Sequence, residues 1–270
     1  MKLIESKVEV IEQQPGLDGV YKQIELAGRT CYKSEDKITE DSAKGFVDRM
    51  IKSKHGAMLE HGTVYLSVPK EETEIIGFHG WCQYSKVRSD LVMEEPCNWL
   101  ITTNMRVLVE HDRLSDLKYI CEPTERHAKR ITVKFICDRA VAQEITRHRV
   151  MSFAMESQRY VGYDKERFGG EITFVKPHWY DEEFPACLTW VESLKESEKK
   201  YLELREAGLK PQDARGVLPN ATKTEIVVTG FESDWEHFFD LRADGTTGAP
   251  HPDIKKLALE LQEKLNSVNK

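Results

Sequence analysis

The chain has 270 residues, and its 39 lysines and arginines against 46 aspartates and glutamates give a formal net charge of −7 at neutral pH. This surplus of acid excludes a protein that coats nucleic acid through a generally basic surface. With 40% hydrophobic and 31% charged residues, the composition is that of a folded globular protein. A chain of this length also buries a stable core without disulfides.

Charged residues near the N-terminus, among them Lys2, Glu5 and Lys7, leave no apolar segment of signal-peptide length. No stretch approaches the roughly 20 apolar residues of a membrane span. The six cysteines are scattered, and no two form a Cys-x-x-Cys pair. We therefore expect a cytoplasmic protein with reduced thiols, without a zinc ribbon and without a membrane or nucleic-acid partner.

The first half of the chain predicts a helix, a strand and an insertion. Residues 42–54 carry apolar side chains at helical spacing, and residues 62–68 alternate apolar with polar side chains as a half-buried strand does. From residue 69 to about 130 the sequence is polar and irregular. This segment indicates an insertion packed on the main domain.

The second half has sharper patterns. Residues 131–137 alternate as a strand, and Asp138 is placed to cap a helix that runs to about residue 148. The later elements are a long amphipathic helix over 188–207, a strand over 225–229, a helix opened by a Ser233–Glu236 capping box, and a helix from Asp253. Strands and helices lack the regular βαβ alternation, which favours an α+β fold.

The segment from Glu144 to Tyr160 is unusually rich in functional side chains. It contains three arginines, a histidine, two carboxylates and two serines within seventeen positions. Arginine forks bind phosphate bidentately, so converging arginines would hold a nucleotide or a dinucleotide. The alternative is that Arg147 and Arg149 only complement the negative end of their helix. Ser157 and Arg159, ten and twelve residues after Arg147, favour a binding site.

The Arg-His-Arg run at 147–149, followed by seven residues and Ser157, resembles the signature of the flavin-dependent thymidylate synthases. Three further segments agree in order and approximate spacing with that family, namely residues 28–32, residues 55–61, and Arg215 with the run from Trp235 to Arg242. The resemblance covers about residues 20–68 and 131–244. Four motifs in the correct order are more specific than any one alone.

The resemblance implies a single domain over residues 1–270 with a mixed or antiparallel sheet, flanking helices and the insertion at about 69–130. It also implies the reductive methylation of dUMP to dTMP, with methylenetetrahydrofolate as carbon donor and with FAD, recharged by NADPH, as hydride source. Such sites are completed across the subunit interfaces of a homotetramer in that family. We therefore expect small-molecule substrates and a homo-oligomer.

The resemblance assigns the site residues one by one. The catalytic residue is Arg242, whose guanidinium would stabilise negative charge on the uracil ring without a cysteine nucleophile. The expected cofactor-binding residues are His55, Arg147, His148, Arg149 and His237. The expected substrate-binding residues are Glu144, Arg147, Glu156, Ser157, Gln158, Arg159, Arg215 and Arg242.

The chain departs from the family pattern at one place inside the long motif. Ala154 and Met155 stand where the family has Asn-Glu, and Glu156 follows one place later. This change makes an inactive family member one alternative. Another alternative is a nucleotide- or RNA-binding module that uses the Arg-His-Arg face without redox chemistry. No metal site is expected, because His55 and His61 do not share one face of a helix. His178 and His251 have no neighbours in sequence that argue for a function.

Overall fold

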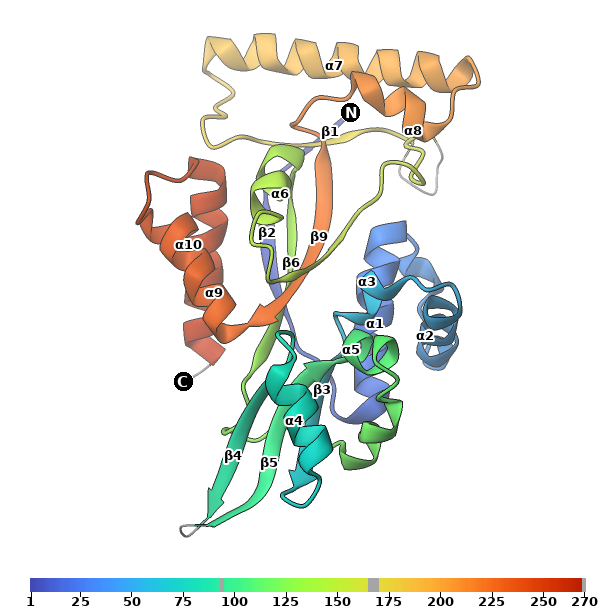
Figure 1. Ribbon diagram of the computed structural model, residues 1–270. Helices are drawn as coiled ribbons and strands as arrows, with labels where there is room; N and C mark the ends of the chain where they lie inside the picture. The colour runs from blue at the N-terminus through green and yellow to red at the C-terminus, as the bar shows by residue number, and fades with distance from the viewer. Residues whose placement is uncertain (93–94, 165–169, 269–270) are drawn as a thin grey trace.

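The computed structural model describes residues 1–92, 95–164 and 170–268, and it is built around an antiparallel sheet of four strands (Figure 1). The strand order is β2-β6-β9-β7. The bounds are β2 Lys7–Ile11, β6 Arg130–Asp138, β9 Lys223–Phe231 and β7 Ser152–Met155. The predicted strands over 131–137 and 225–229 are confirmed, and both extend further because β6 and β9 pair along their full lengths, from Arg130↔Phe231 to Asp138↔Lys223.

Apolar side chains pack on both faces of this sheet. On one face, Phe135 and Val228 are fully buried with Trp235 and Phe238 of α9 (Glu232–Phe239) and with α10 (Pro252–Val268). On the other face, Val227 packs with α1 (Gly16–Tyr32) and its neighbours. Strand β9 is buried on both faces, which explains why three apolar residues, Ile226, Val227 and Val228, follow one another without alternation. The aromatic residues of α9 are therefore core residues.

The segment around 69–130 is more regular than its sequence predicts. It contains α4 (Thr73–Trp81), α5 (Met105–Glu110) and the short helix η2 (Leu114–Tyr119). Its strands β4 (Lys86–Val92) and β5 (Glu95–Asn104) join β3 (Thr63–Pro69) in a second antiparallel sheet of order β3-β5-β4. The pairing of β3 with β5 joins residues 29 to 41 positions apart, from Pro69↔Asn98 to Thr63↔Asn104, and a local polar pattern does not reveal it.

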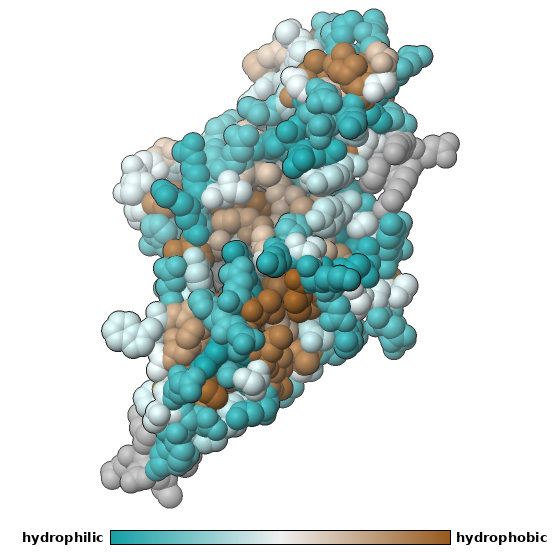
Figure 2. All heavy atoms as spheres, turned by 45° about the vertical axis from the view of Figure 1, so that its right-hand side comes forward, coloured by the Kyte–Doolittle hydropathy of each residue, from teal (hydrophilic) through white to brown (hydrophobic). Residues whose placement is uncertain are grey.

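The remaining helices and strands lie outside the two antiparallel sheets. Helix α7 (Pro185–Glu206) crosses one end of the sheet (Figure 1) and ends before Gly208, whose φ of +89° suits a glycine. Figure 2 shows exposed apolar atoms at this end, and Leu188 of α7 is 66% exposed. The other elements are β1 Lys2–Ile4, β8 Thr173–Val175, η1 Glu35–Lys37, α2 Ser42–Lys52, α3 Gly56–Leu59, α6 Arg139–Ile145, α8 Pro211–Ala214, η4 Arg215–Val217 and η5 Asp240–Asp244.

The architecture confirms the α+β class and the predicted antiparallel sheet with flanking helices, and β1 and β8 form a separate two-stranded parallel sheet. The described cysteines, which are Cys31, Cys82, Cys121, Cys137 and Cys187, are free thiols. Among the described helices, none is long and apolar enough to cross a bilayer.

Two helix boundaries differ from the prediction. Asp138 caps α6 as expected, because its Oδ1 accepts the Val141 N–H at 2.8 Å, but the helix ends at Ile145 and not near residue 148. The predicted Ser233–Glu236 capping box is wrong. Helix α9 begins at Glu232, where the Asp234 carboxylate accepts the Phe231 N–H at 2.8 Å. The chain turns directly from β9 into this helix because β9 extends to Phe231.

Candidate active site

The Arg-His-Arg run lies in the turn between α6 and β7, at one end of the main sheet. Strand β6 leads into α6, and this helix ends at Ile145. Residues 147–149 were expected in its last turn, but they lie beyond its end. The Met151 N–H donates to the His148 carbonyl at 3.0 Å, which tightens this turn. As a result His148 points inward and is 6% exposed, whereas Arg147 and Arg149 are exposed.

Arg242 is the residue that joins this turn to the C-terminal part of the chain. It lies in η5, a π-helical turn of a type that is frequent at functional sites. Its Nη1 donates to Glu144 Oε2 at 2.7 Å, its Nη2 donates to the Glu144 carbonyl at 3.2 Å, and its Nε donates to His148 Nε2 at 3.3 Å. We call Glu144, His148, His237 and Arg242 the Arg242 cluster.

The geometry determines the protonation state of His148. Guanidinium Nε is always a donor, so His148 Nε2 is the acceptor and the imidazole is neutral with its proton on Nδ1. Burial, followed by the charges of Arg242 and His237, lowers the pKa of His148 to about 4. The exposed ring of His237 lies 6.0 Å from the His148 ring, and the buried Phe238 ring lies 5.0 Å from it. An uncharged imidazole is therefore held at the centre of the cluster.

The residues that follow β7 form a second group. The Ser157 N–H donates to the Cys31 carbonyl at 2.9 Å, and Ser157 Oγ accepts the Arg159 N–H at 3.3 Å. Gln158 is 6% exposed, and its Nε2 has no hydrogen-bond partner in the described structure. Arg159 is exposed, with its guanidinium 5.5 Å from the centre of the Tyr160 ring.

Aromatic contacts connect His55 to this second group. The Tyr32 hydroxyl and His55 Nδ1 are hydrogen-bonded at 2.9 Å, and the Tyr32 and Tyr160 rings lie 5.9 Å apart. His55 is half-buried. His61, in contrast, is fully buried with Nδ1 bonded to Thr229 Oγ1 at 2.9 Å, and burial lowers its pKa to about 3. His61 is therefore part of the buried core.

Glu156 lies in a buried network of charges that the motif does not predict. Its carboxylate is 2.9 Å from Lys223 Nζ, and Lys223 also binds Glu225. Glu225 accepts from Lys33 as well and lies 2.5 Å from Lys134 Nζ. Burial by itself would raise the pKa of the Glu225 carboxyl group. The surrounding lysines, among which Lys223 has the largest effect, instead hold this pKa far below its usual range. Charged residues inside the apolar strands β6 and β9 were the sequence signal for this network.

Arg215 lies apart from both groups, on the exposed turn η4. Within the described parts of the chain, no hydrogen bond or ion pair links Arg159 or Arg215 to the Arg242 cluster. Among the described residues, no carboxylate pairs with the guanidinium of Arg147 or of Arg149. These four arginines are therefore accessible to anionic ligands, but one copy of the chain does not bring them together through direct contacts.

A cavity of about 650 Å³ lies between the segment 69–130 and the main sheet, and Arg149 reaches it from the motif. Its other basic lining residues are Lys86, Arg106 and Arg130. Arg106 forms ion pairs with Glu60 and Glu110. Arg130 is half-buried, desolvation lowers its pKa to about 10, and its buried Nε has no partner in the described structure. Sequence reasoning did not find Lys86 or Arg130, because both lie outside the motifs.

The fold and the site therefore define an α+β protein with a set of arginines suited to phosphorylated ligands. Residues 124–269, which are more than half of the chain, match the model of the family described as thymidylate synthase complementing protein. The chain belongs to this family.

Curated relatives match over part of their length. The flavin-dependent thymidylate synthase of Pyrococcus furiosus is 36% identical over 106 residues, which cover 39% of this chain and 43% of the relative. That of Mycobacterium tuberculosis is 37% identical over 141 residues, which cover 48% of this chain and 54% of the relative. These matches span about half the length of the relatives. Among solved structures, the UMP/dUMP methylase PolB from Streptomyces cacaoi, bound with 5-Br dUMP, is 16% identical with a TM-score of 0.48, over 99% of this chain and 93% of that chain.

Proposed function

We propose that this protein is a flavin-dependent thymidylate synthase, which methylates dUMP reductively to dTMP with methylenetetrahydrofolate as carbon donor. The observation that carries the proposal is the position of Arg242. Its guanidinium is held by Glu144 and lies against His148 of the Arg-His-Arg run. Membership of the family supports the same reaction.

Arg242 acts on the uracil ring. The ring carbon becomes nucleophilic when negative charge on the opposite side of the ring is stabilised, and a guanidinium does this without losing its own proton. The two hydrogen bonds to Glu144 hold the plane of the guanidinium before the substrate binds. The neutral His148 adds no positive charge that would compete for the ring. No cysteine is required.

The donor set near the Arg-His-Arg run fits a dinucleotide cofactor. In the cavity, Lys86, Arg130 and Arg149 have no carboxylate partner among the described residues, and the buried Arg130 Nε is unbonded. Arg147, Arg149, His148 and His237 would hold FAD, with His55 at its outer edge. FAD supplies a hydride when it is bound, and NADPH is the reductant. The segment 69–130 then forms one wall of the cofactor site within a single domain over residues 1–270.

The nucleotide phosphate is bound by Arg159 and Arg215, with Arg147 reaching the same ligand. Ser157 orders the turn that presents Arg159, and the unbonded Gln158 Nε2 is a donor for the nucleotide. Glu144 reaches the nucleotide through Arg242. Glu156 acts at a distance, because its buried carboxylate binds Lys223 and orients the segment that carries Ser157.

The site is completed by other copies of the chain in a homotetramer. Arg159 and Arg215 are exposed, and among the described residues no hydrogen bond or ion pair joins them to the Arg242 cluster, so a second copy has to bring its own arginines to the nucleotide. Sedimentation equilibrium of the purified protein tests this assembly. A monomer that remains fully active would contradict it.

The function is tested with the full chain purified and reconstituted with FAD. We expect visible flavin absorption and release of tritium from [5-³H]dUMP that requires both NADPH and methylenetetrahydrofolate. Exposed Lys44, paired with Asp48 on α2, offers a control variant, Lys44→Met, which keeps both properties. A colourless protein that takes up no FAD would overturn the proposal. Flavin binding without tritium release would identify an inactive family member.

A further inference from the structure

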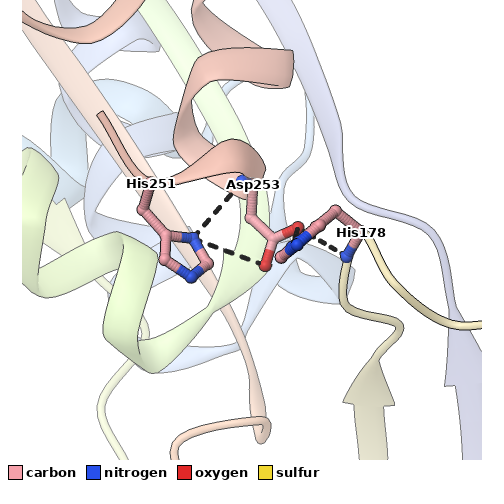
Figure 3. A group of neighbouring side chains, drawn as sticks. All are labelled: His178, His251 and Asp253. Carbon is pink, nitrogen blue, oxygen red and sulfur yellow. Dashed lines mark hydrogen bonds and ion pairs between the residues drawn. The ribbon is translucent and has the colours of Figure 1, made fainter. Parts of the chain in front are cut away.

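Two histidines and an aspartate meet at the start of α10, and none of them belongs to the Arg242 cluster (Figure 3). His178 Nδ1 lies 3.3 Å from Asp253 Oδ1, and His251 Nδ1 lies 3.7 Å from Asp253 Oδ2. One carboxylate thus lies between two imidazoles, with one oxygen toward each ring. Ligand atoms of all three side chains lie within 4.8 Å of one another.

The two nitrogen-to-oxygen separations are close to those of a tetrahedral metal site. Zinc binds imidazole nitrogen and carboxylate oxygen at about 2.0–2.2 Å, so two ligand atoms of a tetrahedron lie about 3.4 Å apart. The nitrogen-to-oxygen distances here are 3.3 Å and 3.7 Å. Imidazole and carboxylate together suit zinc and similar divalent transition metals.

The local hydrogen bonds prepare the ligands. The backbone N–H of His178 donates to Asp253 Oδ1 at 2.7 Å, which fixes the carboxylate against the segment after β8. His251 Nδ1 accepts the Asp253 N–H at 3.3 Å, so this nitrogen carries no proton and its lone pair faces the cluster. Because the hydrogen bond from the Asp253 N–H to His251 Nδ1 is long, its replacement by a bond to a metal ion costs little free energy. Asp138 interacts electrostatically with both Asp253 and His251 and adds negative charge nearby.

We propose that His178, His251 and Asp253 bind a zinc ion that ties the segment after β8 to the first turn of α10. Three protein ligands leave the fourth position to a water molecule. The two histidines are exposed, so the ion is accessible to solvent and exchangeable. The site joins segments that are 75 residues apart and lies near Asp138, which caps α6.

The test uses the full chain after metal removal by a chelator and dialysis, with Co²⁺ as the spectroscopic probe. We expect visible absorption bands of tetrahedral Co²⁺ that saturate at one equivalent and are abolished by Zn²⁺. Zn²⁺ at a hundredfold excess over its Kd is expected to raise the Tm by about 5 °C. Neither readout depends on thymidylate synthesis, so the result is independent of the proposed function.

Variants make the test specific. The double variant His178→Ala/His251→Ala and the variant Asp253→Asn are expected to lose the Co²⁺ bands and the Zn²⁺ shift. The asparagine keeps an acceptor for the His178 N–H, so folding is retained, and circular dichroism verifies this. His111→Ala removes an exposed histidine elsewhere and is expected to bind like the wild type. Absence of bands in the wild type, or bands retained in the folded double variant, would overturn the proposal.

Discussion

Arg242 donates two hydrogen bonds to Glu144, one to the carboxylate at 2.7 Å and one to the backbone carbonyl at 3.2 Å, although the two residues are 98 positions apart. A third hydrogen bond goes to His148. A guanidinium has five N–H groups, so two remain for a ligand. The side chain is therefore oriented by the protein before any nucleotide arrives, which is the preorganisation that charge stabilisation requires.

Replacing Arg242 is expected to separate chemistry from cofactor binding. Arg242→Ala keeps bound FAD and lowers turnover by about 10²–10³, because the removed donor stabilises charge that develops in the transition state. Arg242→Lys is also expected to be slow, since an ammonium cannot replace the planar fork. Tritium release and flavin absorption are measured on the same samples. Loss of flavin from a folded variant would instead assign Arg242 to cofactor binding.

His148 is expected to stay neutral at pH values well below the usual pKa of histidine. Its pKa is lowered to about 4, so the folded state binds fewer protons than the unfolded state between about pH 4 and pH 6.5. This residue therefore lowers stability as the pH falls through that interval. Nitrogen-15 NMR of the imidazole should show the Nδ1–H tautomer at pH 6. A titration midpoint near 6.5 would contradict the observed hydrogen bond from Arg242.

Ser157→Ala is expected to weaken nucleotide binding and to leave measurable turnover. The hydroxyl accepts the Arg159 N–H at 3.3 Å, so its removal loosens the turn that presents Arg159. A net hydrogen bond contributes about 0.5–1.5 kcal/mol, which corresponds to an increase of about 2- to 10-fold in the Kd for dUMP. Calorimetric titration measures this change. Intact binding with complete loss of chemistry would instead indicate a nucleophilic serine.

Glu225→Gln is expected to destabilise the fold by about 3 kcal/mol, because it leaves three partly buried lysines with less compensating charge. Urea unfolding at pH 7 measures the loss. Asp48→Asn, which breaks an exposed pair with Lys44, is the matched control and is expected to cost less than about 1 kcal/mol. Equal effects of the two substitutions on the free energy of unfolding would show that the buried network stabilises the fold no more than an exposed ion pair does.

The same carboxylate predicts a pH dependence of stability. The pKa of Glu225 is lowered in the folded state from an ordinary value of 4.5. Its contribution is therefore present above pH 4.5 and is lost as the pH falls below that value toward the folded-state pKa. The free energy of unfolding of the wild type should decrease over this interval, and that of Glu225→Gln should decrease less. Parallel pH profiles would contradict this assignment.

The sequence by itself determined the local elements and the family. The alternation of β6, the Asp138 cap and the end of α7 just before Gly208 depend on neighbours within a few residues, so periodicity and capping chemistry reveal them. The Arg-His-Arg run and Ser157 are recognised in the same way, as a short pattern. The exact start of α9 was missed because the pairing of β9 with β6 extends the strand to Phe231.

Only the tertiary structure decided which distant groups meet. The pairing of Arg242 with Glu144, the pairing of Lys33 and Lys134 with Glu225 and the pairing of β3 with β5 all join segments far apart in the chain. His178 and His251 likewise become neighbours only when α10 packs against the segment after β8. Many arginines and carboxylates could pair equally well by type. The selection among them comes from the packing of sheet and helices, which no local pattern contains.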